Sequence, residues 1–156
     1  MIRIRVDNLN SSRPLDEAFI KRLALKALPF VKVPEKVQIE IVILDDKRIR
    51  ALNKKYKRAD RPTDVLSFDI GGPVPSKPGT FFGVIYISSD TASRNSKVFN
   101  TSFDEELVLY VIHGILHLFG YEDERPKDRL KMSKKQERIL KILCTKENLS
   151  RVSTRR

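Results

Sequence analysis

The chain has 156 residues, of which 31 are Lys or Arg and 20 are Asp or Glu, and its formal net charge is +11. This length fits one domain with a hydrophobic core of its own. Cys144 is the only cysteine, which excludes an intrachain disulfide and a zinc site built from several cysteines, and favours a reducing compartment. The start of the chain alternates Ile and Arg, and no apolar run approaches the length of about 18 residues that spans a membrane. We therefore expect a cytoplasmic protein without a membrane partner.

The positive charge is concentrated in two segments. Residues 47–61 carry a net charge of +7 and residues 124–156 carry +8, while the rest of the chain sums to −4. Two basic segments on a mildly acidic body favour a polyanionic partner such as nucleic acid. Solvated helix faces have the same composition, so charge alone does not identify the partner.

Strand and helix patterns alternate in the first part of the chain. Residues 1–6 alternate apolar and basic side chains, which predicts a strand, and residues 15–28 have the apolar spacing of a helix. The β-branched run over 37–44 predicts a second strand. Asp45 or Asp46 then caps a helix that carries the first basic segment.

The middle of the chain predicts two more strands. The basic helix is expected to end near Tyr56. Residues 64–70 and 81–88 are rich in apolar and β-branched side chains, which predicts a third and a fourth strand. The Gly- and Pro-rich sequence at 71–80 between them predicts a mobile loop.

The last part of the chain predicts helices. Residues 88–100 are polar and ambiguous, with a short helix as one interpretation. A helix with acidic residues in its first turn runs from about residue 104 to Phe119, with Gly120 as its terminator. Because this helix is apolar almost all round, we expect it to be central. A final helix is predicted over 126–143.

These elements predict one domain with a helix-covered mixed sheet, of the α+β or α/β class. We expect a single catalytic domain over 1–145. The basic end of the chain, 146–156, is predicted to be a frayed tail.

The two histidines of the sequence lie four residues apart in the most hydrophobic predicted helix. This spacing projects His113 and His117 from one face, with Cβ atoms about 5–6 Å apart, close enough to bind one metal ion. Two core histidines with hydrogen-bonded neighbours are the alternative interpretation. A shared cation satisfies both imidazoles at once, so the pattern favours a metal site on this helix.

A carboxylate that follows the histidines can complete the metal site. Gly120 lets the chain turn out of the helix, so Asp123 can return towards the imidazole pair. Glu122 is the alternative ligand, and both acids are also ordinary turn residues. Two neutral histidines and one carboxylate suit one Zn²⁺, and other divalent transition metals accept the same ligands.

The spacing of these residues also matches the outline of the metzincin proteases, with one departure. Gly114 stands where those enzymes have the catalytic Glu that follows the first His. Because Gly cannot serve as a general base, this departure argues against peptidase action.

Two motifs, PTDVLSF at 62–68 and HGILHLFGYED at 113–123, make the chain resemble the YbeY family of bacterial ribosomal RNA maturation endoribonucleases. The remaining residues that carry the resemblance are Leu52, Asn53, Tyr56, Met132, Glu137, Ile139 and Leu140.

The resemblance implies a zincin-like α+β fold. It also implies a single-strand-specific, metal-dependent RNase that acts in 16S rRNA 3′-end maturation and ribosome quality control, with the ribosome or ribosomal proteins as partners. Asp123 stands where the family has a third His, Lys57 where it has Arg, and Val84 where it has Asp.

Basic side chains just before the first motif, PTDVLSF, are candidates for phosphate recognition. Lys57, or Arg58 one place later, is expected to stabilise the scissile phosphate, because cleavage builds negative charge on the phosphoryl oxygens. Lys54, Arg61 and Ser67 are expected to contact substrate.

Asp64 and Ser67 are expected to shape the floor of the cleft, although hydrogen bonding at a strand edge explains them equally well.

Two other functions are alternatives for this sequence: a metallopeptidase-like hydrolase, and a non-catalytic RNA-binding protein of the ribosome.

Overall fold

The computed structural model describes residues 1–70 and 80–153. The predicted loop over 71–80 lies outside these residues except for its last position. The four strands are β1 (Ile2–Asn8), β2 (Lys36–Leu44), β3 (Val65–Asp69) and β4 (Thr80–Ser88). The α-helices are α1 (Glu17–Ala27), α2 (Asp46–Lys57), α3 (Ser89–Val98), α4 (Phe103–Leu118) and α5 (Pro126–Lys146), and short 3₁₀ helices cover Leu28–Phe30 and Leu149–Val152.

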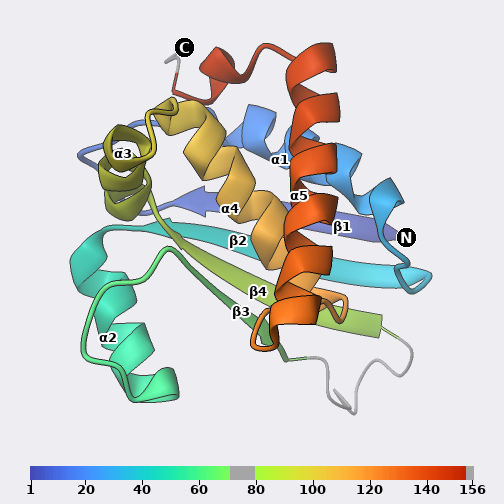
Figure 1. Cartoon of the computed structure of the whole chain (residues 1–156), viewed down its shortest axis with the longest axis horizontal. Coiled ribbons are helices and arrows are strands. Elements are labelled where there is room, and N and C mark those ends of the chain that lie inside the picture. The colour runs from blue at the N-terminus through green and yellow to red at the C-terminus, as the bar shows by residue number, and fades with distance from the viewer. Residues whose placement is uncertain (71–79, 154–156) are drawn as a thin grey trace.

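The strands form one mixed sheet in the order β1-β2-β4-β3. β1, β2 and β4 are parallel, whereas β3 pairs antiparallel with β4 and forms an edge of the sheet. This arrangement confirms the predicted α+β class with a four-stranded mixed sheet (Figure 1). The ambiguous segment after β4 is a regular helix, α3, capped by the Ser88 hydroxyl, which accepts from the Thr91 amide.

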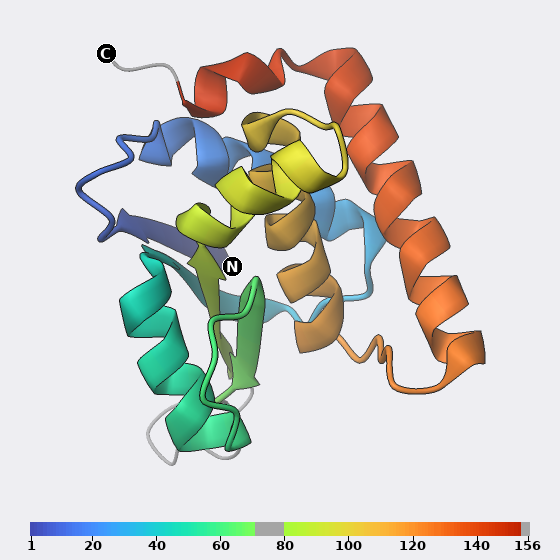
Figure 2. The same cartoon turned by 60° about the vertical axis from the view of Figure 1, so that its left-hand side comes forward.

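The two faces of the sheet are covered differently. On one face, fully buried isoleucines of β2 and β4, such as Ile41 and Ile85, belong to the main core with α1, α4 and α5. On the other face, α2 packs through Ile49 onto Leu44 and Leu66, and this smaller cluster is separate from the main core. Figure 2 shows α2 standing apart from the other helices across the sheet.

Helix α4 lies between the sheet and α5 (Figure 1). Ten of its 16 residues are buried, which confirms the expectation that the most apolar helix is central. The Ser102 hydroxyl caps its start by accepting from the Glu105 amide. Among the described residues, no helix combines the length and the hydropathy that a membrane crossing requires.

The prediction of a frayed tail from residue 146 onwards is wrong for the part of the tail that the structure describes. α5 continues to Lys146, and the following 3₁₀ helix buries Leu149 and Val152 in the main core. The Asp16 amide donates to the Val152 carbonyl at 2.8 Å. Two apolar side chains among the basic residues are enough to dock this segment on α1. Residues 154–156 lie outside the described residues.

One carboxylate ties three segments together beside β4. Asp90, in the first turn of α3, accepts from Arg13 Nε at 2.8 Å, from Asn10 Nδ2 at 3.1 Å and from the Asp46 amide at 3.0 Å. Burial opposes ionisation of Asp90, but these hydrogen bonds outweigh it and hold the pKa of the carboxyl below its ordinary value. Asp90 thus fixes the start of α2 to α3 and to the loop after β1.

Replacement of Asp90 by Asn should lower the free energy of unfolding by about 1–3 kcal/mol at pH 7, because an amide cannot accept all three bonds. A carboxyl with a lowered folded-state pKa stabilises above its unfolded pKa of about 4, and this stabilisation is lost as the pH falls through the folded value. The difference between wild type and Asp90→Asn, measured by urea denaturation, should therefore shrink at acid pH.

Asp60→Asn is the matched control, since the Arg50–Asp60 pair has the same 2.8 Å separation but is exposed to solvent. It should change stability little. An equal loss of unfolding free energy in Asp90→Asn and Asp60→Asn would contradict the role assigned to Asp90.

Candidate metal centre

His113 and His117 face each other from the last turns of α4. Their ring centroids lie 4.5 Å apart, and the two Nε2 atoms are separated by 3.0 Å. Both side chains are partly buried, with about a quarter of each exposed. The helical spacing of four residues thus produces the juxtaposition that the sequence predicted.

The turn after α4 brings a carboxylate to this pair. The helix ends at Leu118, Gly120 adopts a φ of +97°, and the Tyr121 amide donates back to the Leu116 carbonyl at 3.0 Å. As a result, Asp123 Oδ2 lies 3.2 Å from His117 Nε2 and 3.6 Å from His113 Nε2. Among the described residues, these three side chains form the group whose ligand atoms could hold one metal ion. Glu122 lines the adjacent groove but does not belong to this group.

The Nδ1 atom of each ring lies within hydrogen-bond distance of an oxygen atom. His117 Nδ1 lies 3.0 Å from the Tyr121 carbonyl, and His113 Nδ1 lies 2.9 Å from Gln136 Oε1 on α5. Because a carbonyl oxygen only accepts, His117 carries its proton on Nδ1, and the amide oxygen of Gln136 places the proton of His113 likewise. In neutral rings both Nε2 atoms therefore present bare lone pairs.

With both rings neutral, three acceptor atoms converge on one point. Two imidazole lone pairs and a carboxylate oxygen then repel one another at 3.0–3.6 Å. Nitrogen and oxygen ligands of a tetrahedral zinc ion, each about 2.0–2.1 Å from it, lie about 3.3–3.4 Å from one another. The side chains of His113, His117 and Asp123 thus fit a divalent cation in chemistry and in spacing.

Gln136 is a residue of this centre that the sequence interpretation missed. It sits in the buried stripe of α5 with Met132, Ile139 and Leu143, at helical spacing. A polar residue inside an apolar stripe is the signal that could have identified it. Its amide orients the ring of His113, a candidate metal ligand, and metal affinity commonly depends on such contacts.

Gly114 lets α4 approach the sheet closely. A Cβ atom at this position would lie 2.5 Å from Ile85 Cγ2 and 3.2 Å from Ser67 Oγ. The Ser67 hydroxyl donates to the Gly114 carbonyl at 3.0 Å. The position therefore points into the helix–sheet contact, and a Glu, which the peptidase pattern requires here, does not fit.

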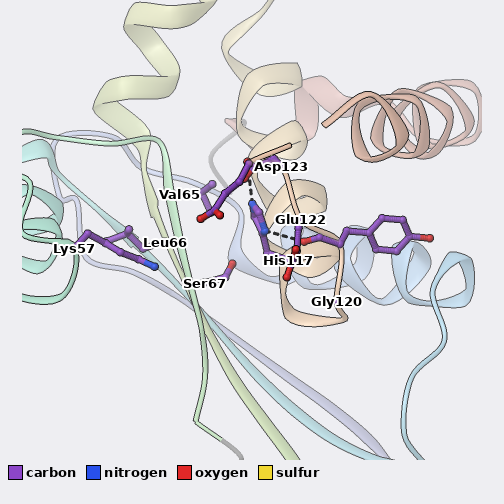
Figure 3. Close-up of a pocket in the computed structure, with 10 residues that line it drawn as sticks. Lys57, Val65, Leu66, Ser67, His117, Gly120, Glu122 and Asp123 are labelled. Atoms are coloured by element: carbon purple, nitrogen blue, oxygen red, sulfur yellow. Dashed lines mark hydrogen bonds and ion pairs between the residues drawn. The ribbon is translucent and has the colours of Figure 1, made fainter. Parts of the chain in front are cut away.

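A groove of about 430 Å³ opens beside these candidate metal ligands. His117 and Asp123 form one wall, and Ser67 with its strand neighbours forms the opposite wall along the edge strand β3 (Figure 3). Lys57, the last residue of α2, extends over this edge and also lines the groove. The structure thus brings Lys57 and Ser67 to the same groove as two of the proposed ligands.

The other predicted substrate residues lie outside the lining of this groove. Arg58 ends α2 in the left-handed conformation, with φ of 56°, and both Arg58 and Arg61 are exposed. Lys54 is exposed one turn earlier on α2. Asp64 accepts from the Val65 amide at 2.8 Å, the local bonding that was its alternative interpretation.

Comparison with known proteins identifies the family. The family model described as Endoribonuclease YbeY matches residues 5–144. The chain belongs to this family.

Curated relatives and a solved structure agree with the YbeY assignment. An Endoribonuclease YbeY from Anaeromyxobacter sp. (strain Fw109-5) is 38% identical over 130 residues, which cover 82% of this chain and 67% of the relative. An Endoribonuclease YbeY from Acetivibrio thermocellus is 32% identical over 94% of this chain and 100% of its own length. A solution structure of a Thermotoga maritima protein aligns with a TM-score of 0.58 and 31% identity, covering 90% of this chain and 87% of that chain.

Replacement of Gln136 by Ala should weaken zinc binding by this YbeY family member about 10- to 100-fold, because His113 loses the acceptor that fixes its ring and tautomer. Competition with a chromophoric chelator measures the affinity. Gln38→Ala, at the other glutamine of the chain, is the control and should bind zinc normally. Equal affinity of wild type and Gln136→Ala would contradict the role given to Gln136.

Proposed function

We propose that this protein is a single-strand-specific, metal-dependent endoribonuclease that acts in 16S rRNA 3′-end maturation and ribosome quality control. The observation that carries the proposal is the convergence of His113 Nε2, His117 Nε2 and Asp123 Oδ2 beside a groove that also holds a lysine. Membership of the Endoribonuclease YbeY family supports RNA as the substrate.

His113, His117 and Asp123 would hold the metal ion, and we propose Zn²⁺ as its identity because two imidazoles and a carboxylate suit that ion. When bound, a divalent ion supplies Lewis-acid chemistry and lowers the pKa of a coordinated water. Gln136 and the Tyr121 carbonyl keep both rings in the tautomer that leaves Nε2 free.

Lys57 places positive charge in the groove, where it binds the scissile phosphate and stabilises the negative charge that develops during cleavage. Its ammonium is a single point charge, whereas the arginine expected at this place in the family donates two parallel hydrogen bonds. Arg58, Arg61 and Lys54 are exposed around the end of α2 and hold neighbouring phosphates.

The proposed setting is the cytoplasm, with ribosomal RNA and ribosomal proteins as partners. The net charge of +11 favours association with such a polyanionic particle. The metallopeptidase alternative is disfavoured by Gly114, whose position leaves no room for a catalytic Glu.

Cleavage of a single-stranded rRNA fragment by zinc-loaded protein tests the proposal. His113→Ala should abolish both zinc binding and cleavage, since one of three ligands is lost. Lys57→Ala should lower kcat about 10²- to 10³-fold without loss of zinc, the range found when one charge-stabilising group is removed. Lys57→Arg should retain activity.

Lys97→Ala, an exposed lysine on α3, is the control and should cleave like wild type. Wild-type rates in His113→Ala would overturn the proposal. RNA binding without cleavage by the zinc-loaded wild type would instead support the non-catalytic alternative.

A further inference from the structure

An exposed aromatic side chain stands at the end of α2, beside the groove. Tyr56 is 54% exposed, and its ring centroid lies 5.2 Å from that of Phe68 on β3. Phe68 in turn contacts Tyr86 on β4, with centroids 6.0 Å apart and ring planes at 68°. The three rings form a ladder that reaches from the sheet to solvent.

The inner part of this ladder is firmly packed. Phe68 and Tyr86 pack against the buried cluster of Leu44, Ile49 and Leu66 on the α2 face of the sheet. The ring of Tyr56 is therefore held against a supported neighbour before any ligand arrives. A preformed surface of this kind loses little conformational entropy when it binds.

Two ammonium groups accompany the rings. Lys55 Nζ lies 5.2 Å from the centroid of Tyr56, and Lys57 Nζ lies 5.9 Å from the centroid of Phe68. Cations beside an exposed aromatic ring suit a ligand that combines a flat, apolar face with negative charge. An unpaired nucleotide has both, a base that stacks and a phosphate that pairs with lysine.

The two outer rings of the ladder come from α2 and β3, and both of these elements also line the proposed catalytic groove. Lys57, which follows Tyr56, lines the groove, and so does Ser67, which precedes Phe68. Because successive strand residues point to opposite faces, Ser67 faces α4 while Phe68 faces α2. A strand of RNA that passes over the edge of β3 therefore meets the groove first and the tyrosine next.

We propose that Tyr56, supported by Phe68, is a stacking platform for an unpaired nucleobase of the RNA whose phosphate lies at Lys57. This inference rests on the proposed function and adds a reason for single-strand preference. Bases of a duplex are already stacked and paired, so they are not available to an exposed ring.

A double-mutant cycle, in which one change is a protein substitution and the other an abasic nucleotide in the RNA, tests the platform through binding affinity. Each member is made in a His113→Ala background, in which the RNA stays intact, and the probes are short single-stranded RNAs with one abasic nucleotide at successive positions. Tyr56→Ala should weaken binding of the unmodified RNA at least about fivefold, the lower end of the effect of base–aromatic stacking. One abasic position should weaken binding to the Tyr56 protein similarly, and the two losses should not add.

Controls separate stacking from structural damage. Tyr56→Phe should bind the unmodified RNA like its parent, because the ring is retained. Phe99→Ala removes another exposed aromatic, 64% accessible at the C-terminal end of α3, and should leave binding unchanged. Thermal unfolding checks that Tyr56→Ala is folded at the temperature used.

Additive losses from Tyr56→Ala and every abasic position, or a loss in Phe99→Ala equal to that in Tyr56→Ala, would overturn the platform. The cycle measures binding alone, so a failure of the platform leaves cleavage by the wild type intact. Absence of cleavage by the zinc-loaded wild type overturns the proposed function while the cycle still reports on stacking.

Discussion

The convergence of three candidate ligand atoms is the constraint around which this site is organised. His113 Nε2, His117 Nε2 and Asp123 Oδ2 lie within 3.6 Å of one another, and in neutral rings both nitrogens face the carboxylate as lone pairs. Each is fixed from outside: one ring by Gln136 on α5, the other by the Tyr121 carbonyl, and the carboxylate by the turn at Gly120. A divalent cation would attract all three atoms, and the contacts that fix them from outside orient them towards one point.

The close contact between α4 and the sheet determines what lies opposite that cation. Gly114 lets the helix approach Ile85, and Ser67 bonds directly to the helix backbone. The face of α4 that carries the two histidines is thereby placed beside the edge strand β3, over which Lys57 extends from the other face of the sheet. The groove thus has His117 and Asp123 on one side and Ser67 with Lys57 on the other.

Local periodicity was sufficient to predict most of this fold. Alternation and β-branched runs identified the strands, and the spacing of His113 and His117 with the turn at Gly120 predicted that these histidines and Asp123 come together, as the structure shows. Gln136 was missed because its contact depends on how α5 docks against α4, which no local pattern encodes. The sequence left open whether Lys57 or Arg58 reaches the groove. In the structure α2 ends at Arg58 in the left-handed conformation, and Lys57 is the side chain that lines the groove. The packing of Leu149–Val152 on the core was not predicted, because the basic residues around these two apolar side chains gave the segment the composition of an exposed tail.

The most direct test of this account is the X-ray absorption spectrum of the protein loaded with one equivalent of zinc. We expect scattering from two imidazoles and further oxygen ligands at about 2.0–2.2 Å. Asp123→Ala should alter the oxygen contribution and leave both imidazoles. A spectrum with fewer than two imidazoles, or with sulfur scattering from Cys144 at about 2.3 Å, would contradict the central claim.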